Sequence, residues 1–350
     1  MTQNIRTVFW QDGQVALIDQ RRLPHEFHIN TYQSHIALAD AIRVMVVRGA
    51  PAIGAAAGFG IALAAMNSQA SSFEQLERDL QEAERVLAAS RPTAVNLFWG
   101  LRRMMTRLQE LMGLPLDQIR SALLAEAQAI ADEDVQTNQT MGANGAELIP
   151  QNATIYHHCN TGALATVDWG TALGVIRSAH EQGKNPFVLV DETRPRLQGA
   201  RLTSWELMRW GINHQIVVDG ASGHYMRTRG VDLCIVGADR IAANGDTANK
   251  IGTYNLALAA HAHHVPFYVA APFSTVDLSL ANGDLIPIEE RGDDEVLCIG
   301  SERIAPEGAK AGNPAFDVTP NAYITAIITE YGVIRPPFEE RLRAIADARR

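Results

Sequence analysis

The stretch Thr154-Ile-Tyr-His-His-Cys-Asn-Thr-Gly-Ala-Leu-Ala-Thr166 decides the fold of this 350-residue chain. A short apolar strand at 154–156, a polar loop at 157–162 and a helical run from 163 to about 181 follow one another here. Strand, loop and helix in this order predict that the chain enters a parallel sheet at this point.

Cys159 lies in the loop of this stretch, just before the predicted helix. Asn160 or Thr161 is a natural N-cap, so the backbone N–H groups of the first turn would be open to a bound anion. A thiol placed just before a helix N-terminus has a pKa below its ordinary value of about 8.5. Two interpretations stay open on this evidence: a reactive thiol, or a small buried side chain, which is what most cysteines are.

Strand-length apolar runs alternate with helical stretches from Ala153 onward. The runs occupy residues 154–156, 187–190, 215–218, 232–237 and 267–271. This alternation predicts a Rossmann-like parallel sheet with helices on both faces.

The first part of the chain shows no such alternation. Residues 8–19 predict a hairpin around Asp12-Gly13, which is a strong turn signal. Helical patterns follow at 34–47, 73–90, 97–112 and 117–145. We therefore expect an α/β protein with an N-terminal hairpin and helical-bundle domain over residues 1–146 and a Rossmann-like catalytic domain over residues 147–350.

The composition excludes several classes of protein. A net charge of −9 argues against a nucleic-acid surface, which needs clustered Lys and Arg. Three widely spaced cysteines do not make a disulfide framework and suggest a reducing cytoplasm. The N-terminus has no apolar core of a signal peptide. Residues 50–66 carry no charge, but this Ala- and Gly-rich segment indicates a closely packed internal helix rather than a membrane span.

Polar side chains follow four of the predicted strands. In a parallel sheet, ligands bind beyond the carboxyl ends of the strands. Cys159 follows the first strand, Asp191-Glu192 the second, Asp219 the third and Asp239 the fourth. We therefore expect these groups to lie along one edge of the sheet.

Each of these segments also has a plainer interpretation. The loop Asp191–Gly199 holds acids, arginines and an amide, but it could be a solvated loop with local ion pairs. Asp239 is either an acid at a strand end or a capping aspartate. Lys250, in a predicted turn over 244–252, is either a phosphate partner or a surface lysine. Arg48-Gly-Ala-Pro51 is similar to a phosphate cradle at a helix start, although four residues are weak evidence.

Sharper cofactor motifs are absent. The first strand is not followed by G-x-G-x-x-G, and the chain has no G-x-x-x-x-G-K-[ST], which argues against nicotinamide and nucleotide cofactors. His157-His158-Cys159 and the histidines at 261, 263 and 264 have no matching second cluster at metal-ligand spacing. We therefore expect no metal.

Taken together, the segments closely resemble the methylthioribose-1-phosphate isomerases of the methionine salvage pathway, nearly from end to end. The motifs that carry the resemblance are Trp10–Gly13, Leu17–Pro24, Arg48–Gly54, Arg91–Leu97, His158–Thr166, Asp191–Gly199, Gly237–Ile241 and Asn249–Tyr254. His157 departs from the pattern, because a less polar strand residue is expected there.

The resemblance implies an aldose–ketose sugar-phosphate isomerase that converts 5-methylthioribose 1-phosphate to the ribulose 1-phosphate. It implies that Cys159 and Asp239 are the catalytic pair, and that the chain forms a homodimer without metal or organic cofactor. The substrate contacts that it implies are Arg48, Gly49, Ala50, Arg91, Gln198, Asn249 and Lys250.

Alternatives remain at this point. A sister isomerase would act on 5-deoxyribose 1-phosphate or ribose 1,5-bisphosphate with the same acid and thiol. The regulatory subunits of the translation-initiation guanine-nucleotide exchange factor share the architecture without catalysis. A cysteine hydrolase is chemically conceivable, but no further feature supports it.

Overall fold

The computed structural model describes residues 6–92 and 94–349, so Thr93 of the Arg91–Leu97 motif lies outside the described residues. Their internal contacts divide them into two compact units. The N-terminal unit contains the described residues up to Thr137 together with Ala163–Gly170, and the C-terminal unit contains Asn138–Gly162 and the residues from Thr171 onward. The division falls inside helix α5 (Leu116–Ala146), before the boundary at residue 147 that the sequence indicates.

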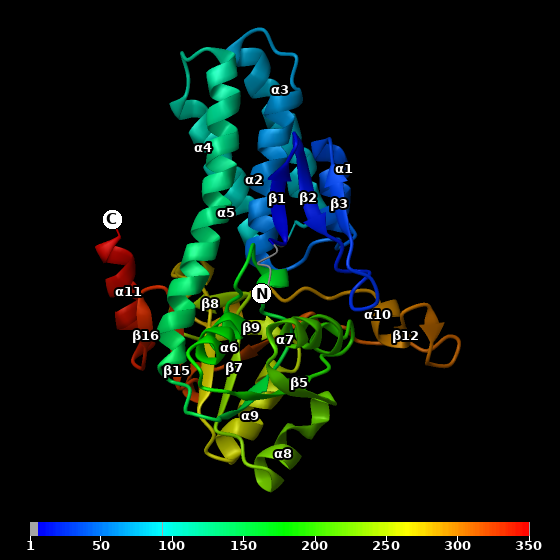
Figure 1. Ribbon diagram of the computed structural model, residues 1–350, viewed down its shortest axis with the longest axis vertical. Coiled ribbons are helices and arrows are strands. Elements are labelled where there is room, and N and C mark those ends of the chain that lie inside the picture. Colours follow the sequence, from blue (N-terminus) through cyan, green and yellow to red (C-terminus); the bar gives the residue numbers. More distant parts are fainter. Residues whose placement is uncertain (1–5, 93, 350) are drawn as a thin grey trace. The chain divides into compact units, whose positions relative to one another are not determined.

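The N-terminal unit begins with a three-stranded antiparallel sheet (Figure 1). Strands β1 (Val8–Gln11) and β2 (Gln14–Ile18) form the predicted hairpin, with Gln11 opposite Gln14. Asp12 and Gly13 both have positive φ, as the two-residue turn of a twisted hairpin requires. A third strand, β3 (Ile29–Tyr32), pairs with β2 and was not predicted.

Helices α1 (His35–Arg43), α2 (Ala50–Asn67), α3 (Phe73–Ser90) and α4 (Val95–Glu110) complete this unit with the first part of α5. The side chains of Ser34 and Ser72 cap α1 and α3 by accepting backbone N–H groups. Helix α1 ends earlier than predicted because Met45 takes a positive φ, which a helix cannot continue through.

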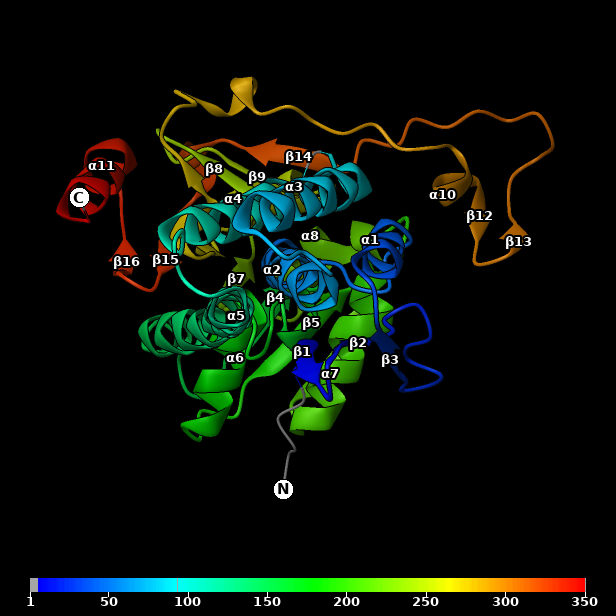
Figure 2. The same ribbon diagram turned by 90° about the horizontal axis from the view of Figure 1, so that it is seen from above.

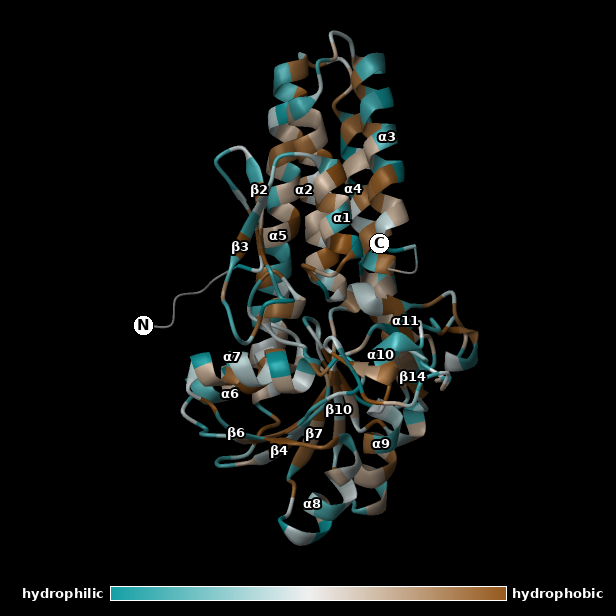
Figure 3. Ribbon diagram, turned by 90° about the vertical axis from the view of Figure 1, so that its right-hand side faces the viewer, coloured by the Kyte–Doolittle hydropathy of each residue, from teal (hydrophilic) through white to brown (hydrophobic). Residues whose placement is uncertain are grey.

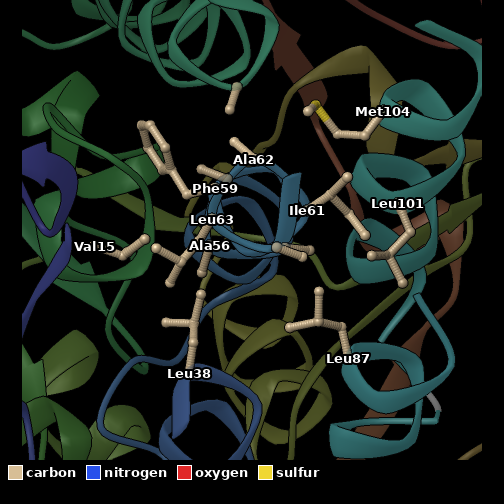
Figure 4. Packing of buried hydrophobic residues seen from close by; sticks show 14 of the residues in the cluster. Val15, Leu38, Ala56, Phe59, Ile61, Ala62, Leu63, Leu87, Leu101 and Met104 are labelled. Atoms are coloured by element: carbon tan, nitrogen blue, oxygen red, sulfur yellow. The ribbon is translucent and has the colours of Figure 1, made fainter. Parts of the chain in front are cut away.

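Helix α2 is the centre of the N-terminal core. Side chains such as Phe59, Ile61 and Leu63 leave it on different sides and meet residues of the hairpin and the other helices (Figure 4). Among the described residues, α2 is the helix long and apolar enough to cross a membrane by length and composition alone. Most of it is buried inside the unit, as is usual for the core helix of a soluble protein.

The C-terminal unit is built on a seven-stranded sheet in the order β16-β15-β10-β7-β4-β5-β6. Its strands are β4 (Thr154–His157), β5 (Phe187–Asp191), β6 (Asn213–Val217), β7 (Leu233–Val236), β10 (Phe267–Ala270), β15 (Ala326–Thr329) and β16 (Gly332–Ile334). All neighbours are parallel except β15 and β16. The five strands predicted from the sequence are confirmed within a few residues.

Helices cover both faces of this sheet, because both faces of its strands are apolar (Figure 3). Ile155, Val188 and Ile235 pack on one face with α6 (Ala172–Glu181) and α7 (Ser204–Trp210). The alternate residues Tyr156, Leu189 and Cys234 pack on the other face. They share a buried cluster with residues of α8 (Ser222–Thr228), α9 (Thr253–Ala262) and α11 (Phe338–Ala348). The predicted Rossmann-like, doubly wound architecture is confirmed.

A second sheet in this unit corrects one prediction. Its order is β11 (Val276–Asp277), β8 (Arg240–Ala242), β9 (Thr247–Lys250) and β14 (Phe316–Thr319). The predicted turn over 244–252 is wrong in extent, since residues 247–250 pair with β8 on one side and β14 on the other. The turn itself is short and is closed by hydrogen bonds between Asn244 and Asp246.

A smaller segment extends from this unit away from the seven-stranded sheet (Figure 2). It contains α10 (Asp294–Leu297) and the antiparallel pair β12 (Cys298–Ile299) and β13 (Glu302–Arg303).

Close packing of α2 on α4 yields a prediction. A Cβ atom added to Gly100 would lie 2.5 Å from the backbone oxygen of Gly54. We expect Gly100→Ala to lower the free energy of unfolding by about 1–3 kcal/mol, the usual cost of overpacking. Urea unfolding would measure it. In the control Gly223→Ala, on α8, nothing lies within 4 Å of the added atom. A Gly100→Ala protein as stable as that control would contradict this packing.

Candidate active site

The strand order fixes where ligands can bind in the C-terminal unit. The chain runs outward from β4 through β5 and β6, then returns to β7 on the other side of β4. Parallel strands that diverge in this way leave a crevice at their carboxyl ends. Cys159 follows β4 and Asp239 follows β7, so the two predicted catalytic residues flank this switch point. The two loops meet, since a Cβ on Gly237 would lie 2.8 Å from Thr161 Cγ2.

The segment after β4 corrects the predicted helix. A single 3₁₀ turn covers Ala163–Ala165, and the α-helix begins only at Ala172. Trp169 and Gly170 both have positive φ, which interrupts a right-handed helix. Asn160 and Thr161 therefore do not cap a helix that follows them directly. Instead, the Thr161 hydroxyl accepts the N–H of Leu173 in the first turn of α6, at 3.0 Å.

Cys159 is held from its backbone and its sulfur. It has a φ of 70° and is 5% exposed. Its N–H donates to Thr193 Oγ1 at 3.0 Å, and its carbonyl accepts from Thr203 Oγ1 at 2.8 Å. Gln198 Nε2 donates to Cys159 Sγ at 3.4 Å. A cysteine with positive φ is strained, and strained residues are frequent at active sites. This favours a reactive thiol over a small buried side chain.

Gln198 carries a second feature of the site. Its side chain is buried, and its Oε1 has no hydrogen-bond partner among the described residues. A buried amide oxygen without a partner is costly, so an incoming hydroxyl would gain free energy by donating to it.

The loop from Asp191 to Gly199 is not the solvated loop of the plainer interpretation. Asp219 accepts the N–H groups of Thr193 and Arg194 at 2.8 and 2.7 Å. A Cβ on Gly199 would lie 1.7 Å from the Asp191 carbonyl oxygen, so only glycine fits there. A π-helical turn, Gly199–Thr203, then leads into α7 and brings Thr203 to Cys159. Such turns are frequent at functional sites.

The two histidines before Cys159 differ in charge. Both are buried. His157 Nδ1 lies 2.8 Å from the Ile235 carbonyl, and its Nε2 lies 3.3 Å from the hydroxyl of Thr161. Burial lowers the pKa of His157 to about 4, so this residue is neutral. The ring therefore donates to the carbonyl and accepts from the hydroxyl, which explains how a polar residue is accommodated at this strand position.

His158 has acceptors on both ring nitrogens. Nδ1 lies 2.8 Å from Asp191 Oδ2, and Nε2 lies 2.9 Å from the Ile251 carbonyl. Burial alone would lower the pKa of His158, but the hydrogen bond and charge of Asp191 raise it to about 9. Tyr156 donates to the other oxygen of Asp191 at 2.8 Å. His158 and Asp191 thus form a buried ion pair.

Ligand atoms of His158, Asp191 and Asp219 lie within 4.8 Å of one another, close enough to surround a metal ion. In this structure those groups are occupied by hydrogen bonds to each other and to the backbone of Thr193 and Arg194. The network explains why the three side chains gather, and the expectation of a metal-free enzyme stays a prediction.

Asp239, Asn249 and Lys250 are joined by the hairpin of the second sheet. Asp239 is half-buried, and its N–H donates to the Ala248 carbonyl at 2.9 Å. Asn249 is buried and donates to Thr253 Oγ1 at 3.0 Å. Lys250 is also buried, with Nζ 2.7 Å from the Ala315 carbonyl, so it is not the surface lysine of the plainer interpretation.

The remaining predicted residues, Arg48, Gly49, Ala50 and Arg91, belong to the N-terminal unit. Gly49 precedes α2 with a φ of 94°, and a Cβ there would lie 2.2 Å from the Ala165 carbonyl oxygen. Ala165 also belongs to this unit, although it follows Cys159 closely in the chain. Arg48 and Arg91 are half-buried.

Three residues that hold the site were not singled out from the sequence. Thr193 and Thr203 bind the backbone of Cys159, and the buried Glu206 accepts from Asn160 Nδ2 at 2.6 Å. His158 was noticed only as a metal candidate. A threonine with positive φ, as at Thr193, leaves no signal in a single sequence.

Comparison with known proteins shows the family of the chain. The sequence model of the initiation factor 2 subunit family matches residues 46–336. A methylthioribose-1-phosphate isomerase from Geobacter sp. strain M21 is 55% identical over 342 residues, which cover 98% of this chain and 99% of that protein.

Solved structures of the same two kinds of protein superpose on this chain. The 5-methylthioribose 1-phosphate isomerase from Pyrococcus horikoshii OT3 superposes with a TM-score of 0.95 at 48% identity, over 99% of this chain and 97% of that one. The translation initiation factor eIF-2B subunit delta from A. fulgidus gives a TM-score of 0.88 at 46% identity, over 97% and 99%.

Fold and site thus define a doubly wound α/β protein with a strained thiol at its switch point. The chain belongs to the initiation factor 2 subunit family, and within it to the methylthioribose-1-phosphate isomerases. It is accordingly an isomerase.

The neutral state of His157 yields a prediction about acid stability. Its folded pKa of about 4 lies below the ordinary value of 6.5, so the unfolded chain binds a proton that the folded chain does not. The stability that this residue contributes is therefore present above pH 6.5 and is lost as the pH falls through about 4.

We expect the free energy of unfolding of wild-type protein to fall more steeply between pH 6.5 and 4 than that of His157→Gln, as measured by urea unfolding. The exposed residue His263 provides the control, and His263→Gln should keep the wild-type slope. Equal slopes for all three proteins would show that His157 does not stay neutral.

Proposed function

We propose that this protein converts 5-methylthioribose 1-phosphate to 5-methylthioribulose 1-phosphate in methionine salvage. The observation that carries the proposal is the fixed thiol of Cys159 beside the strand end that bears Asp239. The names of the relatives at about half identity over nearly the whole chain supply the substrate.

The substrate sets two chemical tasks. An anomeric phosphate is locked as a ring without a free aldehyde, so an acid has to protonate the ring oxygen before the ring opens. Hydrogen must then pass from C2 to C1. We assign the first task to Asp239 and the second to Cys159, which takes the C2 proton as thiolate and returns it at C1 through an enediol. A positioned general base of this kind contributes about 10²–10⁴-fold.

Cys159 could alternatively only stabilise charge while the hydrogen moves as hydride. The contact from Gln198 favours the first route, because an amide N–H that donates to sulfur stabilises a thiolate. The unpartnered Oε1 of the same side chain suits a sugar hydroxyl, which fits the predicted substrate contact of Gln198.

We assign phosphate binding to the substrate contacts that the resemblance implies in the N-terminal unit. Arg48 and Arg91 carry guanidinium groups, which match phosphate geometry. Gly49 and Ala50 stand at the start of α2, where no side chain caps the first-turn N–H groups. In the C-terminal unit, Asn249 and the buried Lys250 complete the proposed set.

We further propose a cytoplasmic homodimer. The three cysteines are free thiols, as in proteins of a reducing compartment. The dimer rests on the family resemblance, and light scattering of purified protein would test it.

Turnover on three sugars tests the reaction. We expect ketose formation fastest from 5-methylthioribose 1-phosphate, compared with 5-deoxyribose 1-phosphate and ribose 1,5-bisphosphate. Cys159→Ser and Asp239→Asn should each lose at least about a hundredfold in kcat, because each removes a proton-transfer group. Cys298→Ser, at a half-buried cysteine on β12, is the matched control and should keep activity.

Activity confined to another sugar would keep the mechanism and change the substrate. An inactive wild-type protein on all three sugars would favour a regulatory subunit instead. Full activity of both Cys159→Ser and Asp239→Asn would reject the catalytic pair.

Arg91 provides a separate test of phosphate recognition. We expect Arg91→Ala to raise KM roughly tenfold or more, since hydrogen bonds to charged groups are worth about 1.5–3 kcal/mol. Competitive inhibition by inorganic phosphate should weaken in parallel. The exposed Arg85, which pairs with Glu82 on α3, serves as control, and Arg85→Ala should change neither value. An unchanged inhibition constant for phosphate in Arg91→Ala would remove this role.

A further inference from the structure

The loop after β5 contains two arginines that the proposed reaction does not use. Arg194 and Arg196 stand between two residues with positive φ, Thr193 at 62° and Leu197 at 57°. A loop with such strained residues keeps its conformation only where its surroundings impose it. The same loop carries Gln198, whose amide donates to the proposed catalytic thiol. The support of this loop therefore bears on the reaction.

Both arginines reach out of the loop to helix α10. Arg194 Nη2 donates to the Val296 carbonyl at 2.8 Å, and Arg196 Nη1 donates to Glu295 Oε1 at 2.7 Å. These partners lie 102 and 99 residues further along the chain. Helix α10 thus supports the strained loop from outside.

The carboxylate of Glu295 is held on its own side as well. Asn313 Nδ2 donates to Glu295 Oε2 at 3.3 Å, and Arg291 Nη1 lies 3.8 Å from the same oxygen. Fixing a long side chain in one rotamer costs conformational entropy. Because its neighbours already fix the carboxylate of Glu295, the ion pair with Arg196 needs less further ordering.

The segment that carries α10, residues 289–315, also reaches a second proposed substrate contact (Figure 2). It closes at its base, where the Ala315 N–H donates to the Glu289 carbonyl at 2.8 Å. The Ala315 carbonyl accepts from Lys250 Nζ at 2.7 Å. One segment therefore links Lys250, on the second sheet, to the loop of Gln198, which follows the seven-stranded sheet.

We infer that Glu295 is a positioning residue for the proposed reaction, because its ion pair with Arg196 fixes the loop that brings Gln198 to Cys159. The inference rests on the proposed function. The side chains of Arg196 and Glu295 are 38% and 22% exposed, and ion pairs as exposed as this contribute little to stability. Misplacement of a group at a reacting centre, by contrast, can cost up to about 10²-fold in rate.

Kinetics of the two single variants and the double variant test the ion pair. We expect Glu295→Ala to lower kcat/KM at least about fivefold, with an unchanged midpoint of thermal unfolding. Arg196→Ala should show the same loss, and the double variant should show no further loss. Glu339→Ala, which removes an ion pair with Arg343 within α11, is the control and should keep the wild-type kcat/KM.

A cycle with Gln198 separates positioning from a general structural effect. In a Gln198→Ala background, we expect Glu295→Ala to have little further effect on kcat/KM, because the ion pair acts through Gln198. Losses that multiply independently would overturn the inference, and so would a wild-type kcat/KM in Glu295→Ala.

Hydrogen exchange tests the same inference without turnover. The N–H groups of Leu197 and Arg201 donate to backbone carbonyls of the loop, each at 2.8 Å. In Glu295→Ala we expect peptides over residues 193–203 to exchange at least about fivefold faster, since local opening becomes easier. Unchanged exchange there would overturn the inference. An inactive wild-type protein would overturn the proposed function, whatever the exchange rates.

Discussion

The rest of the site depends on one constraint, which is that the chain stays buried after it leaves β4. Residues 155–162 are all buried, although four of them, His157, His158, Asn160 and Thr161, are polar. Buried backbone and side-chain groups need hydrogen-bond partners. Thr193, Thr203 and Glu206 supply them from the loop after β5 and from α7. The strained backbone of Thr193 and the π-helical turn before α7 are the means by which these partners reach the loop.

The same constraint sets the charge of each histidine. His157 and His158 are adjacent and equally buried, so burial alone cannot distinguish them. Their partners do: a carbonyl and a hydroxyl suit a neutral ring, whereas a carbonyl and a carboxylate suit a protonated ring. A buried ion pair gains little stability over an apolar pair of the same size. Its presence beside Cys159, the proposed catalytic thiol, is therefore not explained by stability.

Patterns that depend on neighbouring residues could be predicted from the sequence. The hairpin at Asp12-Gly13, helix α3 and the five central strands follow from turn chemistry and periodicity. The placement of Cys159 and Asp239 at one edge of the sheet follows from strand order, which the alternation of strands and helices already implied. The implied substrate contacts, by contrast, stay predictions.

What could not be predicted depends on contacts between distant segments. The apolar run from Ala163 has a helical period, but Trp169 and Gly170 adopt left-handed conformations that the period does not reveal. Strand β9 is polar and short, and it forms because β14 pairs with it from 66 residues further along, between Lys250 and Phe316. Glu206 gives no signal on α7, since only the fold directs its carboxylate to the loop of Cys159.

The chain is also similar to an initiation-factor subunit, so these polar contacts bear on whether it is catalytic. Shared architecture does not imply shared activity, because function lies in sites placed on a fold. A doubly wound sheet needs neither a cysteine with positive φ nor a buried ion pair next to it. Strain of this kind costs about 1–3 kcal/mol and persists only where the surroundings impose it. A chain that worked only through protein contacts would gain stability by relaxing the loop, so a strained and fully supported Cys159 argues for catalysis in this one.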